Sequence, residues 1–135
     1  MRNSAGAIVL LIAGIFLLAS ALLHGMHNLP HLREDMVEIG VRPTLMKAIL
    51  LVLWFSVLSM FAFAALVFGA AVKSFRGAQP ETMSLWIVAV LYTFFGLGAF
   101  VLVSPSHHFL GYTGIGLLVA SGAFLITSRR RDRHA

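Results

Sequence analysis

The sequence predicts an all-α protein, a four-helix transmembrane bundle, and two observations carry this prediction. The chain has 135 residues, of which 59% are hydrophobic and only 11% charged, and its mean hydropathy is +0.92. A soluble domain carries about a quarter charged residues. The charges are also segregated, so that four stretches contain no Asp, Glu, Lys or Arg: 5–23, 48–72, 82–103 and 109–128. Each stretch is about long enough to cross 30 Å of hydrocarbon as a helix, the form that satisfies its own backbone groups in lipid.

We expect the spans at about 5–27, 44–72, 82–103 and 107–128, which leaves little chain for anything beyond one integral-membrane domain over 1–135. The first span has features of a signal peptide, because Arg2 precedes the apolar run and Ala19–Ala21 resembles a cleavage site. The run is longer than the usual signal core of about 7–15 residues, so we interpret it as a helix. The absence of cysteine excludes disulfides, thiolate metal sites and covalent haem attachment.

The basic residues predict that both chain ends face the cytoplasm. In that orientation the inner side carries Arg2, Lys73, Arg76, Arg129, Arg130, Arg131 and Arg133, against Arg33, Arg42 and Lys47 outside. Positive charge accumulates on the cytoplasmic side of membrane proteins. We therefore expect an integral protein of a bacterial inner membrane. Its basic C-terminal run would meet anionic lipid headgroups rather than nucleic acid.

The first outer loop has a pattern of its own. Pro30 disfavours helix at the preceding residue, so the first helix should end or kink there. Beyond it, Leu32, Met36 and Ile39 follow i, i+4, i+7 spacing, with charged residues on the other side. This pattern predicts a short amphipathic helix on the membrane surface.

Small residues recur four positions apart in the later spans, as in Ala65/Gly69, Ala89/Thr93, Gly116/Ala120 and Ala123/Thr127. Small residues let helices approach closely in lipid. The series Gly111, Gly114, Gly116 and Gly122 predicts that the fourth helix is the centre of packing. An oligomer interface and a slot for a flat cofactor are the alternative interpretations.

Five of the six histidines lie at two places, both at ends of apolar segments: His24, His27 and His31, and then His107 and His108. With four spans, all five lie on the outer side. The spacing i, i+3, i+7 would put the first three within about 60° of arc on a continuous helix. Because Pro30 interrupts that helix, only the first two are expected to share a face.

The second histidine group is limited by helix geometry. Adjacent residues point about 100° apart, so only one of His107 and His108 can face squarely inward. Tyr112 lies one turn beyond His108 and is expected to hydrogen-bond to it.

Neutral imidazole is a good ligand for copper, zinc and iron. The sequence therefore predicts a transition-metal site with ligands from His24, His27, His31, His107, His108 and Asp35. Further candidates are Glu34 or, for Cu(I), Met26 and Met36. Alternatively, one histidine from each group, among His24, His27, His107 and His108, binds the iron of haem b axially, with Tyr112 beside it. Interface histidines without a ligand and a pH sensor are the other interpretations.

The apolar stretches 5–23, 48–72, 82–103 and 109–128 contain no charged residue, which disfavours proton-coupled transporters and carboxylate di-iron bundles. No Ser/His/Asp arrangement is visible, so an enzyme is not the expectation. The alternative function is a non-catalytic accessory subunit of a larger membrane complex, or a homo-oligomer, without bound metal.

His27-x3-His31 and the His107–His108 pair resemble fragments of the histidine boxes of membrane fatty-acid desaturases and hydroxylases. The resemblance covers these few residues and implies an oxygenase. That family carries more histidines, in three boxes on the cytoplasmic side. This chain has fewer, and its charges place them outside, so we do not assign it to that family.

Overall fold

The computed structural model describes residues 4–103 and 106–131, and within these ranges it contains helices and no strand. The elements are α1 (Ser4–Leu23), a π-helical turn η1 (His24–Asn28), α2 (Leu29–Glu38), α3 (Pro43–Phe75), α4 (Thr82–Leu102) and α5 (His107–Arg131). Four helical stretches are long and apolar enough to span a membrane: Ala5–Glu38, Pro43–Phe75, Thr82–Leu102 and His107–Ser128. The predicted all-α class is confirmed, as is the number of helices that could span a membrane, whereas the exact spans, the single domain, the orientation and the bacterial inner membrane stay predictions.

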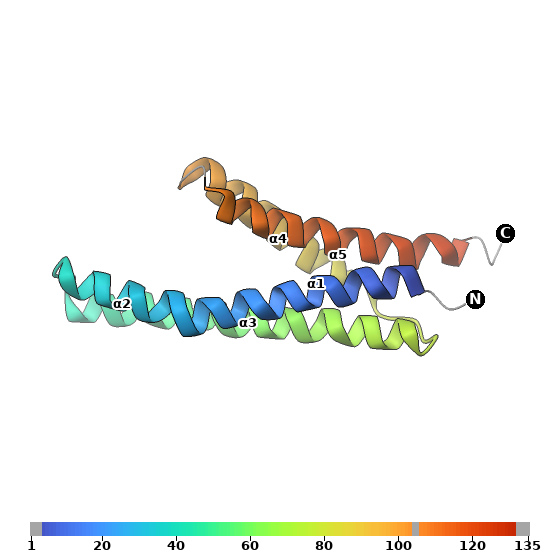
Figure 1. Ribbon diagram of the computed structural model, residues 1–135, viewed down its shortest axis with the longest axis horizontal. Coiled ribbons are helices and arrows are strands. Elements are labelled where there is room, and N and C mark those ends of the chain that lie inside the picture. Colours follow the sequence, from blue (N-terminus) through green and yellow to red (C-terminus); the bar gives the residue numbers. More distant parts are fainter. Residues whose placement is uncertain (1–3, 104–105, 132–135) are drawn as a thin grey trace.

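The helices run antiparallel along one long axis, and α1 begins at the end of the bundle where α5 finishes (Figure 1). Helix α1 packs against both α3 and α5, and α5 packs against α4. Helix α3 has 33 residues and α4 has 21, which correspond to about 50 Å and about 32 Å at 1.5 Å per residue. The hairpin of α2 and α3 therefore extends beyond the C-terminus of α4 and the N-terminus of α5 (Figure 1).

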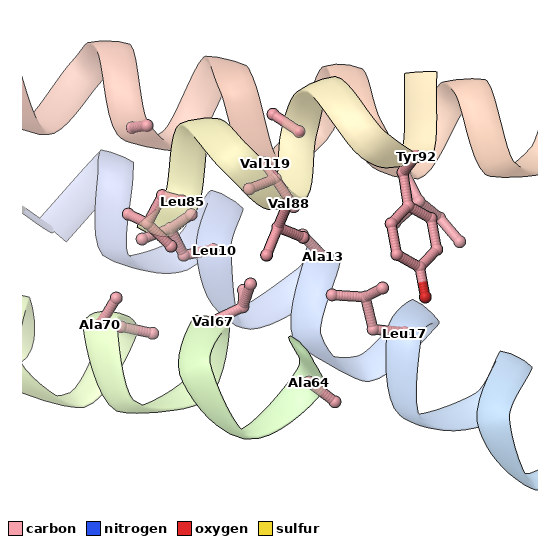
Figure 2. Close-up of a cluster of buried hydrophobic side chains, with 14 of the residues drawn as sticks. Leu10, Ala13, Leu17, Ala64, Val67, Ala70, Leu85, Val88, Tyr92 and Val119 are labelled. Atoms are coloured by element: carbon pink, nitrogen blue, oxygen red, sulfur yellow. The ribbon is translucent and has the colours of Figure 1, made fainter. Parts of the chain in front are cut away.

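The core lies where all four helices meet, and it is apolar (Figure 2). Its largest fully buried side chains come from α1, α3, α4 and α5: Leu10, Leu17, Val67, Leu85, Val88, Val119 and Ile126. The outward side chains are apolar as well, since Phe55 and Phe94 are each 71% exposed. A surface of this kind suits contact with membrane lipid.

Helices α4 and α5 approach backbone to backbone because small residues face each other. A Cβ placed on Gly116 would lie 2.7 Å from the carbonyl oxygen of Ala89 and 2.7 Å from the amide of Thr93. The packing role predicted for these three residues is confirmed. A Cβ on Gly111 or Gly114, by contrast, would meet nothing within 4 Å. Of these three glycines, only Gly116 therefore lies at the contact between α4 and α5.

Local signals explain where helices stop and start. Helices α2 and α3 are each followed, two residues after their last residue, by a glycine with positive φ, Gly40 at 72° and Gly77 at 78°. Glycine adopts this conformation without a side-chain clash. Helix α4 begins after Glu81, whose carboxylate accepts hydrogen bonds from the amides of Met83 at 2.8 Å and Ser84 at 3.2 Å. These contacts satisfy amides that have no partner within the helix.

Of the two outcomes expected at Pro30, an end or a kink of the first helix, the end is wrong, because α1, η1 and α2 form one continuous helical run. The amide of Leu29 donates to the carbonyl of His24, five residues back. This wider turn comes directly before the proline, which lies in the first turn of α2 and lacks an amide hydrogen. Residues 29–38 are helical as expected, but they prolong the first helix and bury Met36. Their location on the membrane surface stays a prediction.

Candidate functional site

The π-helical turn η1 determines which histidines meet. It begins at His24 and contains His27, and a π turn holds more residues than an α turn. Two residues three apart therefore no longer share a face as they would on an α-helix. The ring of His24 contacts α5, whereas the ring of His27 contacts His31 on the following turn. The expected pairing of His24 with His27 is replaced by these two separate pairs.

The first pair joins the start of η1, directly after the end of α1, to α5. The rings of His24 and His108 stack with centroids 5.9 Å apart and planes 23° apart. Nδ1 of His24 lies 3.0 Å from the carbonyl oxygen of Ser20, which can only accept a hydrogen bond. Nδ1 therefore carries the proton, and Nε2 is the nitrogen with a free lone pair.

That lone pair accepts a hydrogen bond from Tyr112, whose hydroxyl oxygen lies 2.6 Å from Nε2 of His24. The hydrogen-bond partner predicted for Tyr112 was His108, and the structure corrects this to His24. The tyrosine ring still touches His108 edge to face, with centroids 5.5 Å apart. The rings of Phe95 and Tyr112 also meet edge to face, with centroids 5.3 Å apart. Tyr112 is 6% exposed, so this hydrogen bond is shielded from solvent.

A second phenol lies deeper in the bundle. The rings of Tyr92 and Tyr112 have centroids 6.1 Å apart, and the Tyr92 hydroxyl points from α4 toward the α1 side of the core (Figure 2). Among residues 4–103 and 106–131 this hydroxyl has no hydrogen-bond partner. Sequence reasoning missed Tyr92 and Ser20 as parts of this site. The available signal was that both are among the few polar residues of otherwise apolar spans.

The second pair lies on the exposed side of η1 and α2. The rings of His27 and His31 meet edge to face, with centroids 4.5 Å apart and planes 83° apart. Nδ1 of His31 lies 3.5 Å from a carboxylate oxygen of Glu34, and both side chains are more than half exposed. This pair belongs to one helical run, so no other helix is needed to form it.

The remaining predicted ligands, His107 and Asp35, are exposed, and their side chains make no hydrogen bond or ring contact within the described ranges. Only one of the two adjacent histidines faces α1, as predicted, and it is His108. In the part of the chain that the structure describes, no three His, Asp or Glu side chains gather closely enough to hold a metal ion. The five histidines therefore lie as two pairs, His24 with His108 and His27 with His31, and a separate His107.

Comparison with known proteins finds no relative: no protein-family model matches the chain, and no curated protein or solved structure is significantly similar to it. The four long apolar helices fit a small membrane protein. Its function must be argued from the two histidine pairs and their surroundings.

Proposed function

We propose that the protein binds a transition-metal ion between α1 and α5, through His24, His108 and Tyr112. One observation carries the proposal: the ring of His24 donates its Nδ1 hydrogen to the Ser20 carbonyl and thereby directs Nε2 at the facing helix. Metal-binding histidines usually have their second nitrogen fixed in this way by a carbonyl or carboxylate. His108 brings a second imidazole from a distant part of the sequence to the same place.

The donor set would be two nitrogens and one phenol oxygen. Histidine nitrogen and anionic oxygen bind zinc at about 2.0–2.2 Å, so two donors on one tetrahedral ion lie roughly 3.3–3.6 Å apart. The present separation of 2.6 Å between His24 Nε2 and Tyr112 Oη needs only a small outward shift of the phenol. Three protein ligands leave a fourth position open to water or another molecule. Copper, zinc and iron all accept such a set.

A haem b is the other occupant that histidines on facing helices would suit. The packing argues for a bare ion instead. The ring of Tyr112 stands against Nε2 of His24, and Phe95 backs that ring at 5.3 Å. A porphyrin bound to this nitrogen would have to occupy the volume of the Tyr112 ring.

The test uses the full chain, purified in detergent, stripped with a chelator and then loaded separately with copper, zinc, iron or haem b. We expect about one tightly held metal ion per chain at this site by elemental analysis after desalting. His24→Ala and His108→Ala should each weaken its binding by roughly tenfold or more. The matched control is His134→Ala, which removes the one histidine outside both groups.

Tyr112→Phe separates a phenol ligand from a neighbouring ring, because it keeps the ring and removes only the oxygen. A phenolate bound to Cu(II) or Fe(III) absorbs visible light, and we expect this band in the wild type and not in the variant. Wild-type protein that retains none of the four ligands after loading would refute the proposal. A Soret band in the wild type that is lost in His24→Ala would show that the site binds haem instead of a bare metal ion.

The orientation of this site toward the outside can be tested directly, since the chain has no cysteine of its own. Ser106→Cys lies just before His107, at the start of α5. We expect a membrane-impermeant maleimide to label it in intact cells. Labelling only after permeabilisation would put the histidines on the cytoplasmic side.

A second candidate function is that of an accessory subunit, and helix α3 favours it. This helix is the most peripheral of the four, because only 11% of its most apolar stretch is buried against the other helices. Its N-terminal half exposes Leu51, Val52, Trp54 and Phe55. At about 50 Å the helix is longer than the hydrocarbon core, so part of this apolar surface lies outside lipid unless the helix tilts.

Native mass spectrometry after gentle extraction tests the accessory function. A stoichiometric second protein, or a defined homo-oligomer, is the expected result for a subunit. A monomer carrying only lipid contradicts it. Metal content can be measured on the same preparation, so each candidate function is tested by its own measurement.

A further inference from the structure

We propose that His27 and His31 form a second metal site, an exposed two-histidine chelate on η1 and α2 that takes a divalent copper, nickel or zinc ion. It shares no residue with the site between α1 and α5, so it goes beyond the proposed function. The proposal rests on three observations: the spacing of the two rings, the contact with Glu34, and the local charge.

The spacing is that of two ligands one helical turn apart. Side chains at i and i+4 lie on one face of a helix and can reach one ion together, as the two histidines of the H-E-x-x-H zinc motif do. Here the two ring centroids are already 4.5 Å apart. Rings this close allow one nitrogen from each to reach a common ion through changes of side-chain torsion alone.

Glu34 orients one of the two rings. Its carboxylate lies 3.5 Å from Nδ1 of His31, and a carboxylate on one imidazole nitrogen leaves the other available as ligand and makes it more basic. The same face therefore contains two ligands and a group that orients one of them, from three residues of one helical run.

The charge around the pair also favours a cation. Residues 33–38 contain three acids, Glu34, Asp35 and Glu38, against the one base Arg33. His31 and Glu34 have side chains 61% and 73% exposed, so an ion can enter and leave from solvent. Because no third His, Asp or Glu is close enough to bind the same ion within the described ranges, water completes the coordination. Such a site exchanges its metal more readily than one enclosed between helices.

The experiment measures zinc binding by isothermal titration, and the nitrogen hyperfine pattern of bound Cu(II) by electron paramagnetic resonance, on the full chain in lipid nanodiscs. The background is His24→Ala/His108→Ala, which removes the site between α1 and α5. We expect one binding event to persist in this background, with two nitrogens on copper. His27→Ala or His31→Ala should weaken it by roughly tenfold or more and reduce the nitrogens to one.

The matched control keeps both histidines and changes only their register. In His31→Leu/Leu32→His the composition is unchanged, but the two rings are five residues apart and no longer share a face. We expect this variant to bind as weakly as His31→Ala. If it binds as tightly as its parent, isolated surface histidines explain the metal, and the chelate is refuted.

The two sites fail separately. If the double-alanine background does not fold, the wild type is titrated instead, and His31→Ala should remove one of two bound equivalents. If the wild type shows only the binding event that His31→Ala removes, and none that His24→Ala/His108→Ala removes, only the proposed function is overturned. If His31→Ala binds as many metal ions per chain as the wild type, only the His27–His31 chelate is overturned.

Discussion

Helix α5 has two interfaces of different character. Against α4 its backbone lies in direct contact with the partner, at Gly116 and Gly96, with no room for an added Cβ. Against α1 the backbones lie somewhat farther apart, since a Cβ on Gly6 would lie 3.2 Å from the Gly122 carbonyl oxygen. In the other half of this interface the side chains of His24, Tyr112 and His108 meet. The closer backbone contact predicts that α4 and α5 form the more rigid pair. Groups that could move to accept a ligand lie between α5 and α1.

The backbone contact should give the largest effect on stability. Gly116→Ala places a methyl group 2.7 Å from the Ala89 carbonyl oxygen and forces α4 and α5 apart. We expect a loss of about 1–3 kcal/mol in the free energy of unfolding, measured by denaturation with SDS in mixed micelles.

Gly114→Ala is the control on the same helix, because its added Cβ meets nothing within 4 Å. It should be neutral or stabilise the helix by up to about 1 kcal/mol, since alanine is the better helix former. Equal destabilisation by both substitutions would show that the backbone contact at Gly116 does not matter.

The interface with α1 should be weaker and should depend on one hydrogen bond. Tyr112→Phe removes the donor to His24 Nε2 and leaves that nitrogen half-buried and unpaired. We expect a loss of about 1–2 kcal/mol, and a His24 imidazole resonance that changes in heteronuclear NMR. Phe63→Leu, at the far side of Tyr92, should leave that resonance in place. A change of the same size in both variants would mean that the resonance reports general repacking.

The smallest effect is expected at the start of α4, where Glu81 caps the helix that forms the rigid pair. Hydrogen bonds from Ser84 lower the pKa of the exposed Glu81 carboxyl below its usual range. A lowered folded-state pKa means that the stabilisation is fully present at neutral pH. It is lost as the pH falls through the lowered pKa of the folded state, because the carboxylate then takes up a proton.

Hydrogen-exchange protection of the Met83 and Ser84 amides measures this contribution. Protection in the wild type should decrease on acidification, whereas Glu81→Gln, which cannot titrate, should be insensitive to pH in the same window. Identical pH profiles for the two proteins would exclude a role for the carboxylate charge.

Much of the fold was predictable because charges are excluded from lipid. The four charge-free stretches predicted the four spans, and the boundaries differ mainly where α3 continues to Phe75 and the first helix continues to Glu38. The continuity of the helix through Pro30 was not predictable from local rules. A proline is expected to end a helix, but the π turn before it lets the chain continue.

The sequence by itself determined that five histidines gather at one end of an apolar helical bundle, because the number of spans decides the side on which each loop lies. Only the tertiary structure decided how they pair. The π turn at residues 24–28 turns His24 toward Tyr112 and His108 and leaves His27 with His31. Pairing depends on helix rotation, and a single extra residue in one turn changes that rotation without leaving a mark in composition or hydropathy.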